Sequence, residues 1–279
     1  MCFLLNTDLA IFFDESGKSR ADKVQLMGGL ALPYNIYFSK QLDSLHQLNL
    51  EYRYHWSEYK GDSKQRNGIL KLFRKSSYLA EYAQLNFIRY SSSDLAERAL
   101  KYNLEQPFIN EESKKNYNII NKMIYTKLPE RIMYGLLRGY SHTSRVTSSI
   151  FIEHANEYET FGLAESMLKQ LNIHSLYRGE SFVVRECIYR RKGEEIGVDF
   201  IDILLGIVRT ILENPDPNSR KKKNQLSLII ELLKENVLQP FISQLRLFEL
   251  KDTNELYEVD VSACVKLFIA KNFEEYSEK

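Results

Sequence analysis

Short apolar runs alternate with segments of helical periodicity along most of the chain. The strand-like runs are LAIFF (9–13), VQLMGGLAL (24–32), LNFIRY (85–90), VTSSIFIE (146–153) and SFVVRECIY (181–189). Continuous apolar runs of this length, bounded by turn residues, are typical of buried strands. The first two runs are separated by a turn containing Gly17, so we expect them to be neighbours in one sheet.

The segments between the strands show apolar residues at helical spacing. Helices are predicted over 34–50, 63–83, 93–140, 159–171 and 197–213. Pro129 lies inside the third segment, where it is expected to break or kink the helix. Strands that alternate with helices predict an α/β domain whose functional groups gather at the strand ends.

The stretch NPDPNSRKKKN (214–224) combines two prolines with four consecutive basic residues and is predicted to be a linker. It separates a domain at 1–213 from a mainly helical C-terminal extension at 225–279. An apolar stripe in this extension either packs on the domain or forms a homodimer. The stripe consists of Leu226, Ile229, Ile230, Leu233 and Val237.

Composition narrows the class of protein. The chain has 279 residues, 44% of them hydrophobic and 27% charged, with a formal net charge of +1. This near-zero net charge does not attract the whole protein to nucleic acid, so any binding of nucleic acid must come from local basic patches. Its three separated cysteines form neither a disulfide framework nor a zinc site and suit a reducing cytosol. The first residues are expected to form a strand rather than a signal peptide, and no apolar run is long enough to span a bilayer.

Several acidic residues end an apolar element or lie within one. They are Asp14, Glu58, Glu153 and Asp202. A carboxylate such as Asp202 in a strongly apolar helix costs several kcal/mol unless it is paired, hydrogen-bonded or bound to a metal. Asp199, three residues earlier, shares roughly the same helix face. Considered one at a time, each acid could equally have a structural role, as a turn former, a helix cap or a hydrogen-bonded polar group in the core.

Four motifs together resemble the domain-of-unknown-function 3800 family, which is similar in fold to ribonuclease H and retroviral integrases. In order they are IFFDESG, HWSEYK, a strand that ends in an acid, and GVDFIDILLG. The family's D-E-S-G motif is matched from Asp14 to Gly17, and its E-x-K motif by Glu58 and Lys60. The resemblance covers residues 8–213.

The closing motif of the family, Q-h-h-D-h-h-x-G, is matched by Asp202 and Gly206. The chain departs from the family at two places. Asp199 stands where the helix motif usually has Gln, and Glu153 stands where the fourth strand more often ends in Asp.

The resemblance implies a ribonuclease H-like mixed sheet flanked by helices and a nuclease that hydrolyses nucleic-acid phosphodiester bonds. Asp14, Glu58, Glu153 and Asp202 would hold Mg²⁺ or Mn²⁺, because oxygen ligands suit hard divalent cations. Two such ions about 4 Å apart would activate a water and stabilise the leaving oxygen.

Other residues are expected to assist around these ligands. Glu15 faces the opposite side of the strand from Asp14, and Ser16 lets the chain turn away and leaves room for a phosphate. Asp199 adds a ligand or an acceptor beside the metal, and His154 either shuttles a proton or is simply packed. Predicted phosphate contacts are Lys60, Arg190, Arg191 and Lys192.

Two other functional classes are alternatives to a nuclease. One is a catalytically weakened ribonuclease H-like module that binds nucleic acid or protein, in a host-defence or mobile-element system. The other is a haloacid dehalogenase-type phosphatase, which requires a second Asp two residues after the first, where this chain has Ser16. The chain lacks a serine-hydrolase elbow, a Walker A loop and a dinucleotide fingerprint.

Overall fold

A computed structural model describes residues 5–19, 22–40, 43–104, 112–251 and 255–277. Within these ranges a seven-stranded sheet runs through the molecule in the order β5-β4-β1-β2-β3-β6-β7. The strands are β1 (Leu5–Ser16), β2 (Gln25–Pro33), β3 (Gln84–Tyr90), β4 (Ser144–Glu153), β5 (Phe182–Arg190), β6 (Leu245–Leu250) and β7 (Leu256–Val259). The run Leu9–Phe13 of β1 is fully buried because both faces of this central strand are covered by helices.

The sheet is mixed. β1, β2 and β3 are joined in antiparallel fashion, whereas β4 lies parallel to β1 and β5 parallel to β4. These five strands form the ribonuclease H-like mixed sheet, so the predicted α/β fold class is confirmed. The antiparallel order also confirms that the first two strands are neighbours.

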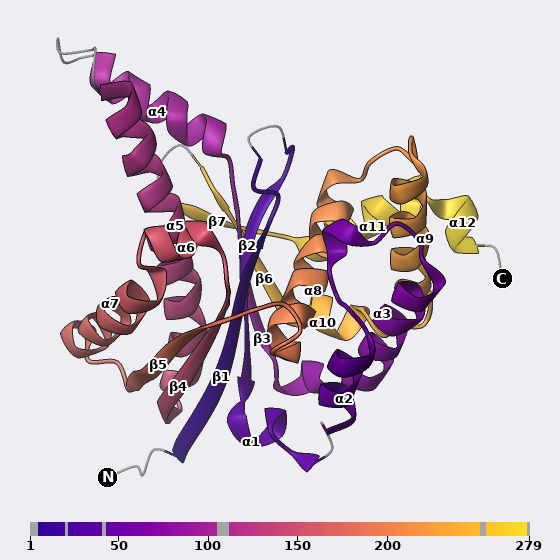
Figure 1. Ribbon diagram of the computed structural model, residues 1–279, viewed down its shortest axis with the longest axis horizontal. Helices are drawn as coiled ribbons and strands as arrows, with labels where there is room; N and C mark the ends of the chain where they lie inside the picture. The colour runs from indigo at the N-terminus through magenta and orange to yellow at the C-terminus, as the bar shows by residue number, and fades with distance from the viewer. Residues whose placement is uncertain (1–4, 20–21, 41–42, 105–111, 252–254, 278–279) are drawn as a thin grey trace.

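Helices pack on both faces of the sheet (Figure 1). Ala10 and Phe12 of β1 belong to the core on one face, and Leu9, Ile11 and Phe13 to the core on the other. The first face carries α1 (Tyr34–Tyr37), α2 (Asp43–Glu51), η2 (Trp56–Glu58), α3 (Ser63–Ser76), η3 (Ser77–Tyr82), α8 (Ile196–Glu213), α9 (Arg220–Lys234), α10 (Gln239–Gln244), α11 (Val261–Lys271) and α12 (Phe273–Ser277). The second face carries α4 (Ser92–Leu104), α5 (Glu112–Ser141), α6 (Asn156–Thr160) and α7 (Leu163–Arg178).

The C-terminal segment contributes strands as well as helices. β6 pairs in parallel with β3, and β7 pairs antiparallel with β6, so this segment extends the same sheet. Helix α9 begins at Arg220, which places the basic run at 220–223 in a helix rather than in a linker. The apolar stripe of α9 is buried against the domain core.

Local differences from the sequence pattern have physical reasons. Pro129 lies inside α5, which continues from Glu112 to Ser141 without ending there. Helix α3 is capped by the side chain of Asp62, which accepts a hydrogen bond from Gln65 N. An aspartate at this position satisfies one of the free N–H groups of the first turn.

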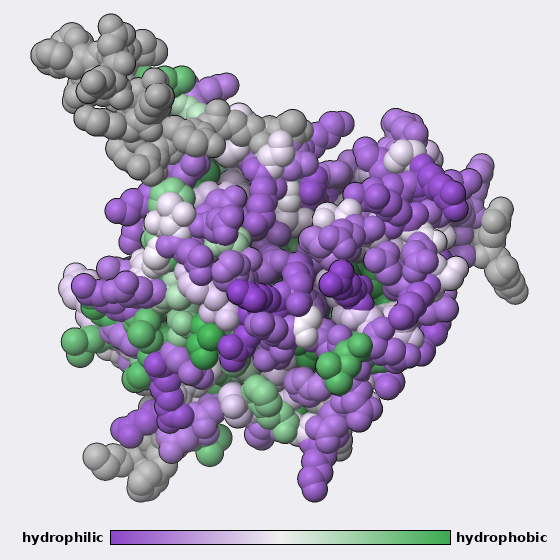
Figure 2. Space-filling view, in the orientation of Figure 1, coloured by the Kyte–Doolittle hydropathy of each residue, from purple (hydrophilic) through white to green (hydrophobic). Residues whose placement is uncertain are grey.

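The surface carries no large uniform apolar face on the side drawn in Figure 2. Hydrophilic side chains predominate there, and hydrophobic ones lie in scattered groups. Of the helices in the described ranges, none has both the length and the apolar character needed to cross a membrane.

Candidate functional site

Parallel pairing of β1 and β4 brings two acids together at the ends of neighbouring strands. Phe13 is in register with Ile152, so Asp14 and Glu153 follow directly at the same edge of the sheet. Asp14 is fully buried, and its Oδ1 accepts a hydrogen bond of 2.7 Å from Glu15 N. Within the described residues its Oδ2 finds no hydrogen-bond partner.

The third acid comes from α8, which packs on β1. Close packing positions this helix: a Cβ on Gly197 would lie 2.5 Å from the Phe12 ring, and one on Gly206 would lie 2.0 Å from the Trp56 side chain. Residues Ile196–Val208 are buried without exception, so the helix is apolar all round except for its two aspartates. Asp202 is one of them and is 5% exposed.

Three groups donate to Oδ2 of Asp202. His55 Nδ1 lies at 2.9 Å, Trp56 N at 3.2 Å and Lys192 Nζ at 2.7 Å. A carboxylate can only accept, so His55 carries its proton on Nδ1, and Nε2 faces the Ser57 hydroxyl at 3.2 Å. These donors keep Asp202 ionised in an apolar helix.

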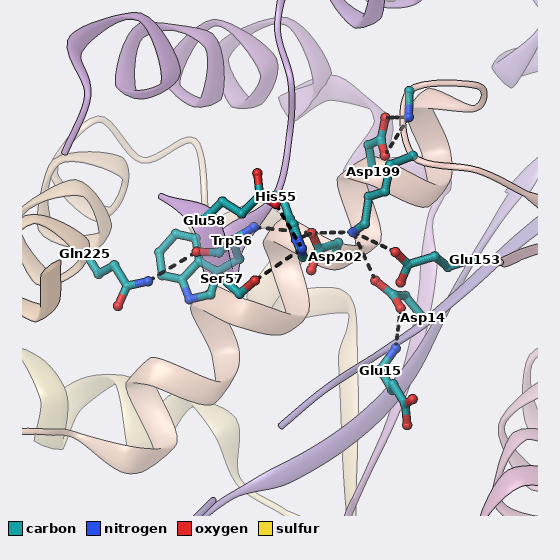
Figure 3. A network of polar contacts seen from close by, with 12 residues as sticks. Asp14, Glu15, His55, Trp56, Ser57, Glu58, Glu153, Asp199, Asp202 and Gln225 are labelled. Atoms are coloured by element: carbon teal, nitrogen blue, oxygen red, sulfur yellow. Dashed lines mark hydrogen bonds and ion pairs between the residues drawn. The ribbon is translucent and has the colours of Figure 1, made fainter. Parts of the chain in front are cut away.

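The ammonium of Lys192 lies among all three carboxylates, which Figure 3 shows from close by. Lys192 Nζ is 2.7 Å from Asp202 Oδ2, 3.0 Å from Glu153 Oε1 and 3.9 Å from Asp14 Oδ2. The Lys192 side chain is 29% exposed, while the three carboxylates are almost fully covered. We refer to Asp14, Glu153, Asp202 and Lys192 as the acid cluster.

The pKa values of the three acids in the acid cluster shift in different directions. Burial, reinforced by the charge of Glu153, raises the pKa of Asp14 well above its usual range. Burial also pushes the pKa of Asp202 and Glu153 upward. The hydrogen bond from His55 and the charge of Lys192 outweigh this for Asp202, and the neighbouring Asp14 and Lys192 outweigh it for Glu153, so both pKa values are lowered. The cluster therefore contains two ionised acids and one that is held toward its protonated form.

Asp199 holds the turn that carries Lys192. Both of its carboxylate oxygens accept from Gly193 N, at 3.3 and 3.0 Å. Gly193 has a φ of +84°, a conformation that favours glycine. Burial raises the pKa of Asp199 to about 7, although the Lys192 charge and the Gly193 N–H act in the opposite direction. Asp199 thus positions a neighbouring residue instead of facing the other carboxylates.

The structure does not bring Glu58 into the acid cluster. Its side chain is 63% exposed, and its Oε1 lies 4.0 Å from His55 Nε2, the residue beside which Figure 3 shows it. Lys60 is exposed beyond it, and its carbonyl accepts from Asn224 Nδ2. Glu58 remains a predicted ligand at the rim of the site.

The other predicted residues lie around the acid cluster or away from it. Glu15 points to the opposite face of β1 and pairs with Lys18 at 2.8 Å. His154 pairs with Glu159 at 3.0 Å, and Arg190 lies over the Phe151 ring.

Of the remaining predicted contacts, Ser16 lines a cavity beside the cluster, whereas Arg191 is exposed on the turn. Only Lys192 among the predicted phosphate contacts enters the acid cluster, and it meets carboxylates there.

His55 is a residue of the site that the sequence pattern did not identify. It bonds Asp202 directly, and it lines two cavities that adjoin the acid cluster. One has a volume of about 660 Å³ and also includes Lys192 and Arg53 in its walls. The other, of about 610 Å³, includes Asp202 and Lys221. The signal for His55 was its place in HWSE, directly before the predicted acid motif.

The donor set suits a hard divalent cation. Three carboxylates supply oxygen atoms, and the buried Asp14 Oδ2 lies 3.9 Å from the Lys192 ammonium that the other two carboxylates contact. As the side chains stand, no group of three or more acids, histidines or cysteines in the described ranges is arranged to hold a metal ion. The ammonium of Lys192 lies between the carboxylates instead.

Strand order and direction give a ribonuclease H-like α/β fold, and a carboxylate cluster lies at the end of its central strand. No family model matches the chain, and no curated protein matches it significantly. Among solved structures it is similar to a chain in the structure of the PCNA:RNase HII complex from Archaeoglobus fulgidus. That similarity has 14% sequence identity and a TM-score of 0.36, and it covers 95% of this chain and 90% of the other. The fold assignment rests on strand order and direction, not on this likeness.

Proposed function

We propose that this chain is a divalent-metal-dependent hydrolase of nucleic-acid phosphodiester bonds. The observation that carries the proposal is the meeting of three carboxylates, from β1, β4 and α8, at one buried point. Gathering like charges in an apolar interior is costly unless cations compensate them. The D-E-S-G, E-x-K and D-h-h-x-G motifs further support membership of the domain-of-unknown-function 3800 family.

Asp14, Glu153 and Asp202 would hold the metal, with Glu58 as a fourth ligand from the rim. A bound Mg²⁺ or Mn²⁺ supplies a Lewis acid for the phosphate and lowers the pKa of a bound water. His55 is oriented by its Nδ1–H bond to Asp202, which leaves Nε2 beside Ser57 to accept a proton. The two adjoining cavities offer room for the substrate on either side of the cluster.

The test is cleavage of labelled single- and double-stranded DNA, RNA and an RNA–DNA hybrid, with Mn²⁺ or Mg²⁺. We expect metal-dependent cleavage of one of these substrates, abolished by EDTA and by Asp202→Asn. Cleavage that persists in Asp202→Asn, or in EDTA, would contradict the proposal.

A second candidate is a catalytically weakened module that binds nucleic acid or protein. The position of Lys192 favours it, because the ammonium already compensates part of the charge of the acid cluster. This candidate predicts substrate binding without cleavage and no stabilisation of the fold by Mn²⁺. A ligand that binds the native state raises the melting temperature, so thermal unfolding separates the two candidates.

A further inference from the structure

Lys192 occupies the centre of a group of acids that outnumber it. One ammonium faces three carboxylates, and its distance to them rises from 2.7 to 3.0 to 3.9 Å. The most distant, Asp14 Oδ2, is buried and without a hydrogen bond among the described residues. A single positive charge therefore leaves the acid cluster only partly compensated, whereas a divalent cation at the same place carries twice the charge.

The turn that carries Lys192 is held by bonds that do not involve its ammonium. Glu194 N donates to Arg191 O, Arg191 N donates to Glu194 Oε2, and Gly193 N donates to the Asp199 carboxylate. The backbone can therefore stay in place while the flexible four-carbon side chain changes rotamer. The Lys192 ammonium can therefore move while the backbone of the turn stays fixed.

Space for such a movement adjoins the acid cluster. Lys192 and Gly193 form part of the wall of the cavity of about 660 Å³, which is also lined by Tyr52 and Lys64. The Lys192 side chain is partly exposed on this side. A rotamer change would carry the ammonium from the carboxylates to this cavity without unfolding any element.

We propose that Lys192 is the resident cation of the acid cluster in the metal-free protein, and that a divalent cation binds by displacing its ammonium into the adjoining cavity. This inference rests on the proposed metal dependence of the site. It adds that metal affinity is set by competition with an internal lysine, and that the displaced ammonium faces the space left for an anionic substrate.

The first test is calorimetric titration of the full chain with Mn²⁺ alone. Lys192→Met removes the charge while keeping a side chain of similar length. The matched control is Lys169→Met, an exposed lysine of α7 on the opposite face of the sheet. We expect Lys192→Met to bind Mn²⁺ about tenfold more tightly than the wild type, corresponding to about 1.4 kcal/mol, and Lys169→Met to match the wild type.

A second measurement needs no variant and covers the case in which Lys192→Met fails to fold. Acetylation of Lys192 in the wild type is compared with and without Mn²⁺ by peptide mass spectrometry, with exposed Lys169 of α7 as the internal reference. Displacement predicts a several-fold rise in labelling of Lys192 on addition of Mn²⁺, and no change at Lys169.

The outcomes separate this inference from the proposed function. Equal or weaker Mn²⁺ binding by folded Lys192→Met, or unchanged labelling in a wild type that binds Mn²⁺, overturns displacement but leaves metal binding intact. Absence of Mn²⁺ binding in both wild type and Lys192→Met overturns the metal site itself. Binding by Lys192→Met alone would show that the ammonium occupies the metal position without being displaced by Mn²⁺, which overturns displacement in the wild type and favours the binding-module function.

Discussion

Asp14 and Glu15 are consecutive acids on β1, and each meets a lysine on its own face of the sheet. Glu15 pairs with Lys18, three residues along the chain, at 2.8 Å. Asp14 shares Lys192 with Glu153 and Asp202, which come from distant elements. One face thus holds a local one-to-one ion pair, and the other holds three acids around one ammonium.

This difference shows why burial of an acid does not by itself define a site. Burial raises the pKa of Glu15 as it does that of Asp14. The Glu15 carboxylate has an ammonium of its own, because Lys18 Nζ lies 2.8 Å from its Oε1, although neither Glu15 oxygen has a hydrogen-bond partner among the described residues. The acid cluster holds three carboxylates around one ammonium, whereas Glu15 has a lysine to itself. Because Glu15 also lines one of the two adjoining cavities, the charge imbalance, and not the open space, distinguishes the candidate site.

The largest expected effect is on the rate of nucleic-acid cleavage when Asp14 or Glu15 is replaced by its neutral amide. Asp14→Asn removes a proposed metal ligand and is expected to lower metal-dependent cleavage by about 1,000-fold. Glu15→Gln lies on the other face and is expected to stay within about threefold of the wild type. Initial rates on the preferred substrate measure both. Equal losses of cleavage rate in the two variants would contradict the distinction between the Asp14 face and the Glu15 face of β1.

The next effect concerns the pH dependence of stability. Burial raises the pKa of Asp199 to about 7 in the folded chain, from 3.8. Its stabilising contribution is therefore complete below pH 3.8 and is lost as the pH rises toward 7. Asp199→Asn keeps an acceptor for Gly193 N but does not titrate.

Urea unfolding in EDTA at two pH values measures this effect. Between about pH 5 and pH 8 we expect the free energy of unfolding of the wild type to fall by about 2–3 kcal/mol more than that of Asp199→Asn. Parallel pH profiles would show that Asp199 is not a titrating group.

A smaller effect is expected from overpacking beneath the acid cluster. A Cβ at Gly206 would lie 2.0 Å from the Trp56 side chain, whereas one at exposed Gly139 would meet only the flexible end of Gln84. Gly206→Ala is expected to lower the free energy of unfolding by about 2 kcal/mol. Gly139→Ala, in α5 on the other face, should be neutral or stabilising by up to about 1 kcal/mol. Chemical denaturation of both variants tests the contrast.

The smallest effect is expected from breaking the local ion pair. Lys18 is 43% exposed, and the buried Glu15 that it leaves behind can take up a proton because burial already raises its pKa, so at pH 5 Lys18→Met is expected to cost about 1 kcal/mol. Mn²⁺ should not restore this loss, because Glu15 takes no part in the acid cluster. Recovery of the melting temperature of Lys18→Met by Mn²⁺ beyond that of the wild type would contradict the comparison.

The sequence predicted those parts of the fold that depend on local pattern. Fully apolar runs predicted the buried strands, and an acid directly after such a run predicted Asp14 and Glu153 at one sheet edge, as the parallel register shows. Asp202 was identified because a carboxylate in an apolar helix requires partners. The fold class followed from the alternation of strands and helices together with the family resemblance.

The remaining features depend on tertiary contacts. The β6 segment LRLFEL alternates between buried and exposed only over its first three residues, so its strand signal was short and its helical surroundings concealed it. Lys192 lies in a basic run that favours phosphate contact, and only the Gly193 turn directs it to the carboxylates. Glu58 precedes a helix as predicted, but η2 places its side chain at the rim.

The measurement that tests the central claim most directly is thermal unfolding of the wild type, Asp14→Asn and Glu15→Gln in EDTA and in Mn²⁺. If the acid cluster binds a divalent cation, Mn²⁺ raises the melting temperature of the wild type and of Glu15→Gln, but not that of Asp14→Asn. A wild type whose melting temperature does not respond to Mn²⁺, or an equal response in Asp14→Asn, would contradict the account.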